Sequence, residues 1–173
     1  DDSIDLPANV LLVEAGASDR GLFITMPGAL PFVYQNTKIN WGHRSGPEPH
    51  LNNRIVNWPR GRVLGGSSAI NGLLYVRGQA QDFNVWRQLG NVGWSYEDVL
   101  PYFKRSEDQE RGEDAYHGTG GPLGVANVRL AQNTLCEAFI EACEAAGIPR
   151  NDDFNGASQE GAGYFQLTNR NGR

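Results

Sequence analysis

A glycine-rich stretch at residues 61–71 holds most of the groups in this sequence that could bind an anionic ligand. It reads Gly-Arg-Val-Leu-Gly-Gly-Ser-Ser-Ala-Ile-Asn. The adjacent Gly65 and Gly66 let the backbone approach a flat or phosphorylated ligand where a side chain would clash. The two serines and Asn71 add hydrogen-bonding groups, and Arg62 adds positive charge. The stretch predicts a loop that holds an anionic cofactor and performs no chemistry itself.

Two simpler interpretations of the same residues exist. A Gly-Gly-Ser-Ser sequence is often no more than a tight turn. A nucleophilic serine is disfavoured, because neither Ser67 nor Ser68 lies in a G-x-S-x-G pattern. The residues around the loop must decide between a turn and a cofactor contact.

Glu14 is the second candidate for a cofactor contact. It follows the apolar run 10–13 and precedes Ala15 and Gly16. This pattern predicts a buried parallel strand with an acid at its carboxyl end, where Rossmann-type sheets bind the cofactor ribose. A solvated acid at a strand end is the alternative.

The expected glycine-rich turn before Glu14 is missing from the sequence. In dinucleotide-binding folds the turn precedes the acid by about 20 residues. Thirteen residues precede Glu14 here, and none is glycine. We therefore expect this sequence to be an internal piece of a longer protein.

Continued through Tyr75, Gly78 and Asn84, the glycine-rich stretch resembles the first signature of the glucose–methanol–choline (GMC) flavoprotein oxidoreductases. Other segments resemble the same family, at residues 10–16, 47–51, 58–61, 93–95, 99–103, 117–118, 121–123 and 153–156. The resemblance covers the whole chain and is greatest to choline dehydrogenase-like alcohol dehydrogenases.

The resemblance implies an α/β fold, a Rossmann-like FAD/NAD(P)-binding domain of GMC type with part of an inserted α+β substrate-binding domain. It implies that residues 1–121 belong to the FAD-binding domain, without its first glycine turn. Residues 122–163 would belong to the substrate-binding domain, and residues 164–173 would return to the FAD-binding domain.

The resemblance also implies FAD as the cofactor. Ile70 stands where choline oxidases carry a histidine that is covalently joined to the flavin, so we expect non-covalent binding. Trp41 is a flavin or adenine neighbour by this resemblance, although an aromatic that anchors a loop is the alternative. The residues expected against FAD are Glu14, Ala15, Trp41, Arg62, Leu64, Gly65, Gly66, Ser67, Asn71, Gly72, Leu73 and Leu74.

The implied reaction is oxidation of a small alcohol, choline-like or another primary alcohol, to the aldehyde by hydride transfer to flavin N5. The electrons would pass to oxygen, a quinone or another carrier. The family's catalytic histidine, paired with His or Asn, would lie beyond Arg173, so we expect no catalytic residue here and an inactive chain that binds FAD poorly. The alternatives are a lyase or decarboxylase on the same scaffold, and a small acidic binding module without enzymatic activity.

The three histidines, His43, His50 and His117, fall in polar or glycine-rich segments and are predicted loop residues. Neither their spacing nor that of the cysteines indicates a metal site. Cys136 and Cys143 lie seven residues apart on a predicted helix. That places them roughly 10 Å apart along its axis, too far for a disulfide. Two reduced cysteines are typical of a cytoplasmic protein.

Three helices are predicted. One covers residues 82–89. The second begins after Ser95, with Asp98 completing a near capping box, and its expected buried side carries Val99, Leu100, Tyr102 and Phe103. The third covers residues 134–146, and its expected core stripe is Leu135, Phe139, Ala142, Cys143 and Ala146.

The remaining segments are predicted as strands and loops. Residues 121–128 and 163–168 read as strands. Residues 19–40 read as a loop with one short helical turn, 42–57 as an exposed excursion, and 107–113 as a solvated loop.

Composition excludes some classes of function. The net charge of −5 argues against a nucleic-acid partner, whose binding surfaces are usually basic. No run of about 18 apolar residues occurs, so no membrane span is expected.

Overall fold

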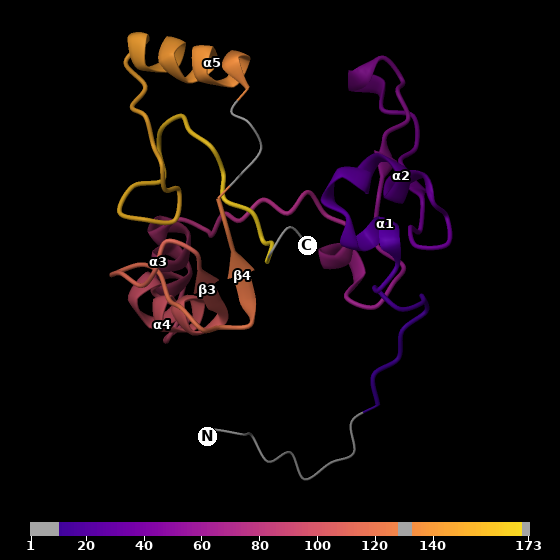
Figure 1. Ribbon diagram of the computed structural model, residues 1–173, viewed down its shortest axis with the longest axis horizontal. Helices are drawn as coiled ribbons and strands as arrows, with labels where there is room; N and C mark the ends of the chain where they lie inside the picture. The colour runs from indigo at the N-terminus through magenta and orange to yellow at the C-terminus, as the bar shows by residue number, and fades with distance from the viewer. Residues whose placement is uncertain (1–10, 128–132, 171–173) are drawn as a thin grey trace. The chain divides into compact units, whose positions relative to one another are not determined.

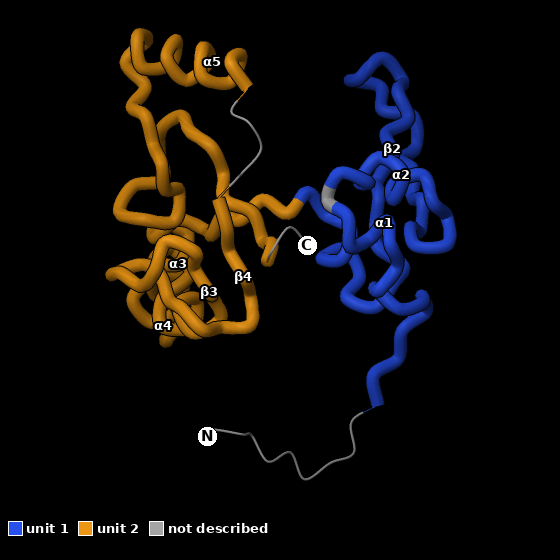
Figure 2. Tube along the Cα trace, in the orientation of Figure 1, with its two compact units in different colours: residues 1–72 blue, residues 73–173 orange. Residues whose placement is uncertain are grey.

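The computed structural model describes residues 11–127 and 133–170, which divide into two compact units (Figures 1 and 2). Unit 1 is Asp1–Gly72 and unit 2 is Leu73–Arg173. No helix among the described residues is long and apolar enough to cross a membrane.

Unit 1 is built from short elements around a small apolar core. Val33, Val63 and Ile70 are buried together, with Ile24 and Ile39 packed against them. The elements are α1 (Leu22–Thr25), η1 (Pro27–Ala29), α2 (Leu30–Gln35), β1 (His43–Arg44), η2 (Pro49–Leu51), β2 (Asn57–Trp58) and η3 (Gly66–Ala69). The prediction of a single short helical turn within residues 19–40 was wrong, because three helical elements, α1, η1 and α2, lie there.

A two-stranded antiparallel ladder precedes the glycine-rich loop. His43 of β1 lies opposite Trp58 of β2, and Asn40 forms an isolated bridge with Gly61 in the same register. The Trp41 N–H donates to the Arg60 carbonyl at 2.9 Å, which continues the ladder between them. Residues 42–57 are mostly exposed, as predicted for an excursion.

The predicted strand at residues 10–13 is wrong where the structure describes it. Residue 10 lies outside the described residues, and residues 11–13 are not in a strand. Leu11, Leu12 and Val13 are 85%, 78% and 80% exposed. A central parallel strand needs neighbours on both sides, and no described strand pairs with this segment.

In unit 2, the two helices α3 (Ala80–Gln88) and α4 (Tyr96–Ser106) confirm the first two helix predictions. The Ser95 hydroxyl accepts from the Asp98 N–H, and the Asp98 carboxylate accepts from the Ser95 N–H, which forms a capping box. Phe83 of α3 packs edge-on against Phe103 of α4 at 5.6 Å between ring centroids. Tyr102 was wrongly assigned to the buried side, since it is 62% exposed.

The third predicted helix is α5 (Thr134–Ala145), but its expected core stripe is wrong. Leu135 and Phe139 are 77% and 67% exposed, whereas Ile140 is buried. Ile140 lies about 100° around the helix from Phe139. The periodicity of the sequence finds an apolar face, but it does not encode which side of the helix the rest of the unit covers.

The strands of unit 2 form a small mixed sheet. β3 (Glu107–Gln109) pairs in parallel with β4 (Leu123–Val125). Beyond β4, Ala126 bridges to Leu167, and Leu167 bridges to Leu74, both antiparallel. The predicted strand at 121–128 is confirmed for 123–125, and its last residue lies outside the described residues.

The predicted strand at 163–168 is mostly wrong. Leu167 forms two bridges, but residues 163–166 belong to no strand. The segment before them pairs elsewhere: Ala162 forms a parallel bridge with Arg150, and the Asn151 N–H donates to the Ala162 carbonyl at 2.9 Å. Gly163 lies directly against the Asn151 carbonyl, where a side chain would overlap it.

Candidate functional site

The glycine-rich loop has an open backbone face. Gly65 and Gly66 have φ angles of +85° and +57°, which only glycine adopts readily. The Ser68 hydroxyl donates to the Gly65 carbonyl at 2.6 Å and holds the turn. No atom lies within 4 Å of the position that a Cβ on Gly66 would take. The main chain at Gly66 is therefore accessible to a ligand.

Two other glycines hold this loop against its surroundings. A Cβ on Gly61 would overlap the Gly66 carbonyl, and a Cβ on Gly16 would overlap the Arg62 carbonyl. Ala17 bridges Val63 in parallel, and the Leu64 N–H donates to the Ala17 carbonyl at 2.9 Å. These contacts bring the segment that carries Glu14 and Ala15 beside the loop, as a cofactor site would need.

Glu14 is exposed at the edge of this arrangement. Its Oε1 accepts a hydrogen bond from the Gly16 N–H at 2.7 Å. The second carboxylate oxygen has no hydrogen bond among the described residues, so it can accept one from a ligand hydroxyl.

Arg62 carries positive charge into the same region. Its guanidinium lies 4.9 Å above the Trp41 ring, a cation–π contact. It has no carboxylate partner within residues 11–127 and 133–170, and its buried Nε lacks any hydrogen-bond partner there. The ring of Trp41 is 49% exposed and stacks on His43. A cation without a carboxylate partner among the described residues, beside an open glycine backbone, fits an anionic, planar cofactor.

The other predicted cofactor residues are mostly exposed. Leu64, Ser67, Asn71 and Gly72 are exposed in unit 1, and Ile70 is 4% exposed in its core. Leu73 and Leu74 belong to unit 2, where Leu74 is 60% exposed.

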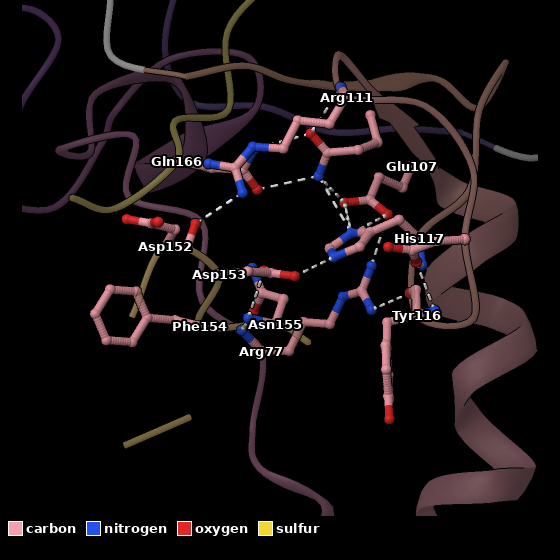
Figure 3. A network of polar contacts seen from close by, with 12 residues as sticks. Arg77, Glu107, Arg111, Tyr116, His117, Asp152, Asp153, Phe154, Asn155 and Gln166 are labelled. Carbon is pink, nitrogen blue, oxygen red and sulfur yellow. Dashed lines mark hydrogen bonds and ion pairs between the residues drawn. The ribbon is translucent and has the colours of Figure 1, made fainter. Parts of the chain in front are cut away.

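Sequence reasoning missed a buried polar network in unit 2 (Figure 3). The Arg77 guanidinium donates to Glu107 at 2.7 Å, and Nδ1 of His117 lies 3.2 Å from both Glu107 oxygens. Nε2 of His117 lies 2.9 Å from Asp153. In Figure 3 the His117 ring lies between the Glu107 and Asp153 carboxylates.

This network corrects two predictions. Glu107 is fully buried at the start of β3, so residues 107–113 do not begin as a solvated loop. His117 does lie in a loop, but its side chain is buried. The sequence carries no local signal for the network, because its partners are 30 and 36 residues apart.

A pocket of about 270 Å³ lies beside this network. Arg77, Tyr96, Tyr116 and Asn155 are among its lining residues. Burial raises the pKa of the Tyr96 phenol, although the Arg77 charge opposes the shift. The Arg77 and Asn155 side chains already bond within the unit, to Glu107, the Tyr116 carbonyl and the Tyr75 carbonyl. These two side chains are therefore already engaged in the fold of unit 2.

No cluster of three or more His, Cys, Asp or Glu side chains that could hold a metal ion occurs among the described residues. Cys136 and Cys143 are both free thiols, as predicted.

The GMC oxidoreductase family matches residues 11–173. The chain belongs to this family. Its α/β, Rossmann-like class with an FAD-binding domain of GMC type is thereby confirmed. One structural neighbour of this GMC oxidoreductase is described as an FAD-dependent oxidoreductase.

Similar curated proteins share about half of the sequence of this GMC oxidoreductase chain. It is 51% identical over 171 residues to an oxygen-dependent choline dehydrogenase of Sinorhizobium fredii (strain NBRC 101917 / NGR234), a match that covers 99% of the chain and 31% of the relative. It is 53% identical over 165 residues to the oxygen-dependent choline dehydrogenase of Rhizobium etli (strain CIAT 652), covering 95% and 30%. The chain thus spans about a third of the length of these relatives.

Solved structures are similar to the chain over most of its length. Pyridoxine 4-oxidase from Mesorbium loti has a TM-score of 0.85 and 34% identity, covering 92% of this chain and 31% of the other. An FAD-dependent oxidoreductase from Chaetomium thermophilum has a TM-score of 0.76 and 31% identity, covering 90% and 28%.

Proposed function

We propose that this chain supplies the cofactor-holding loop of an FAD-dependent alcohol oxidoreductase of the choline dehydrogenase type. The open main chain at Gly66, beside an Arg62 guanidinium that lacks a carboxylate partner among the described residues, carries the proposal. The names of the curated relatives support the substrate class, a small alcohol such as choline. FAD, when bound, supplies an acceptor for the hydride that leaves the alcohol carbon.

Each predicted site residue has a role in this proposal. The Gly65 and Gly66 backbone lets the cofactor approach closely. Arg62, whose guanidinium lies over the Trp41 ring, balances the negative charge of the cofactor. Glu14 accepts hydrogen bonds from the ribose hydroxyls of the cofactor. The small side chain of Ala15, next to Glu14, leaves space for the cofactor there. Ser67 and Asn71 offer polar groups, Gly72 keeps the chain close, and Leu64, Leu73 and Leu74 exclude water.

The cofactor is bound without a covalent link in this proposal. Ile70 has an aliphatic side chain that cannot bond to a flavin, and it is buried against Val33 and Val63.

We infer that residues 1–173 hold no catalytic base. Both ring nitrogens of His117 face carboxylates of the buried network, so this histidine is not free to take a substrate proton. His43 and His50 are exposed on the excursion of unit 1. Alone, the chain is expected to oxidise no alcohol and to bind FAD weakly. Electrons from the alcohol pass to oxygen, as the relatives' names suggest, or to a quinone or another carrier.

The predicted domain boundaries belong to the same proposal. Residues 1–121 and 164–173 form parts of the FAD-binding domain, and residues 122–163 form part of the substrate-binding domain.

The test is an FAD titration of the full-length oxidoreductase that contains this chain and of two variants of it. Binding is measured from the visible absorption of the flavin. Arg62→Met is expected to weaken FAD binding about tenfold, since it removes a charge-assisted contact. Arg20→Met, an exposed cation of the same unit, is the matched control and should change the affinity less than twofold. A native protein without flavin absorbance and without affinity for FAD would overturn the proposal.

A further inference from the structure

Asn40 is the only polar or charged residue that is buried within residues 11–72, and it is 4% exposed. Its Nδ2 donates to the Tyr34 carbonyl at 2.7 Å, and its Oδ1 accepts from the Gly42 N–H and the Arg60 N–H at 3.0 Å each. These partners fix the orientation of the amide, because only its nitrogen can donate to a carbonyl and only its oxygen can accept from an N–H. The side chain is therefore held in one position.

This side chain joins three segments that meet beside the glycine-rich loop. Tyr34 lies in the last turn of α2, where helix carbonyls lack partners within the helix. Gly42 lies two residues after Asn40, at the start of the antiparallel ladder. Arg60 lies 20 positions after Asn40, on residues 57–62, the returning segment of that ladder. Asn40 therefore fastens the returning segment to the end of α2.

Main-chain bonds carry this position along the returning segment. Asn40 itself bridges Gly61, and the Arg62 N–H donates to the Ile39 carbonyl at 2.8 Å. The Gly61 N–H donates to the Ser67 hydroxyl at 3.2 Å, which attaches the segment to the glycine-rich loop. A displaced returning segment would therefore displace Gly61 and Arg62 together.

Residues next to the Asn40 contacts belong to the predicted cofactor site. Trp41 directly follows Asn40, and the Arg62 guanidinium lies 4.9 Å from the centroid of the Trp41 ring. Gly61 lies so close to the Gly66 carbonyl that a Cβ would overlap it. The aromatic ring, the guanidinium and the open main chain at Gly66 thus share one support.

We propose that Asn40 is a positioning residue of the cofactor site, whose amide holds the returning segment so that Arg62 and the Gly66 main chain keep fixed places toward the cofactor. The proposal rests on the proposed function, because it concerns the site at which FAD is expected to bind. Asn40 acts through these residues, since its own side chain is buried and bonded within unit 1. It orders the loop before binding, so less binding free energy is lost in ordering it.

The support is tested first without cofactor, in the full-length oxidoreductase that contains this chain. Asn40→Leu keeps a similar side-chain volume and removes all three hydrogen bonds, whereas Asn40→Asp keeps an oxygen acceptor for the Gly42 and Arg60 N–H groups. Amide hydrogen exchange of peptides from residues 57–65, read by mass spectrometry, should be about tenfold faster in Asn40→Leu and within about twofold of the native rate in Asn40→Asp. A native rate in Asn40→Leu would overturn the claim that Asn40 holds this segment.

FAD affinity then separates a positioning role from a merely structural one. In an FAD titration followed by flavin absorption, we expect binding about tenfold weaker in Asn40→Leu and within about threefold of native in Asn40→Asp. Ile24→Ala is the matched control, because Ile24 packs on the apolar core of the same unit and has no bond to the returning segment. It should lose stability but keep its FAD affinity within about twofold.

The outcomes distinguish this inference from the proposed function. Native FAD affinity in Asn40→Leu, or an equal loss of affinity in Ile24→Ala, would overturn this inference and leave the proposed function in place. A full-length protein without affinity for FAD would overturn both. If Asn40→Leu does not fold, Asn40→Ser takes its place, because the shorter serine side chain cannot reach the Gly42 and Arg60 N–H groups together.

Discussion

Arg77 and Glu107 form an ion pair with 2.7 Å between Nη2 and Oε2, and the two side chains are 3% and 0% exposed. The Gly118 N–H at 3.1 Å and the Gln109 amide at 3.2 Å also donate to Glu107, and Nδ1 of His117 lies 3.2 Å from both of its oxygens. Such bonds offset the cost of removing two charges from water. The pair therefore acts as a polar core that joins segments of unit 2 far apart in the sequence.

Glu107→Gln should strongly destabilise the protein. The substitution keeps the shape of the side chain but leaves the Arg77 charge buried without a counter-ion. We expect a loss of about 3–5 kcal/mol in the free energy of unfolding, measured by urea denaturation.

Asp108→Asn is the control for this experiment. Asp108 pairs with Arg170 at 2.6 Å, but both side chains are partly exposed, at 38% and 54%. Its loss should cost no more than about 1 kcal/mol. Equal effects of the two substitutions would show that burial of the Arg77–Glu107 pair has no energetic consequence.

Gly16→Ala should disturb unit 1 through a backbone clash. A Cβ at Gly16 overlaps the Arg62 carbonyl, so the loop or the segment must shift. We expect a loss of roughly 1–3 kcal/mol, typical of overpacking, in thermal or urea unfolding. Gly28→Ala is the matched control, because no atom lies within 4 Å of a Cβ there, and its effect should stay within about 0.5 kcal/mol. A harmless Gly16→Ala would exclude the close approach of these two segments.

Local signals in the sequence located the helices well. The Ser95–Asp98 capping box needs only residues three apart, and it marks the start of α4 as predicted. The apolar periodicity of residues 134–146 found α5 within one residue of its end. The need for glycine at positions 65 and 66 could be predicted, because two adjacent glycines before serines indicate a tight backbone turn.

Long-range relationships could not be read from the sequence. Glu107 looks solvated among its charged neighbours, and its ion pair with Arg77, thirty positions earlier, cannot be read from the local sequence. The exposed Leu11 and Leu12 form an apolar run that resembles a strand, but a strand also requires partners. The Thr168 N–H and hydroxyl both donate to the Leu73 carbonyl, 95 positions earlier, and no residue type between them indicates this contact.

The face of α5 that was assigned incorrectly gives a third prediction. Ile140 is 3% exposed, so Ile140→Ala removes buried apolar volume and should cost about 2–4 kcal/mol of unfolding free energy. Leu135→Ala on the exposed side of the same helix should change it by less than about 0.5 kcal/mol. The comparison is made by urea denaturation under identical conditions. A larger loss of stability in Leu135→Ala than in Ile140→Ala would support the core stripe predicted from the periodicity.

Asp114 gives a pH-dependent prediction. Burial alone would raise the pKa of its carboxyl, but the N–H groups of Tyr116 and His117 donate to Oδ1 at 2.7 Å each and bring the pKa below its ordinary value. A carboxyl with a lowered pKa in the folded state stabilises the protein above its unfolded pKa of about 3.9, and this stabilisation is lost as the pH falls through the folded pKa. Asp114→Asn keeps an oxygen acceptor but cannot titrate. The wild-type protein should therefore be more stable than Asp114→Asn at about pH 6, and the difference should shrink as the pH falls below about 3.9 toward the lowered folded pKa. Thermal unfolding across this range measures it, and a difference that stays constant with pH would show that the two N–H bonds do not favour the charged carboxylate.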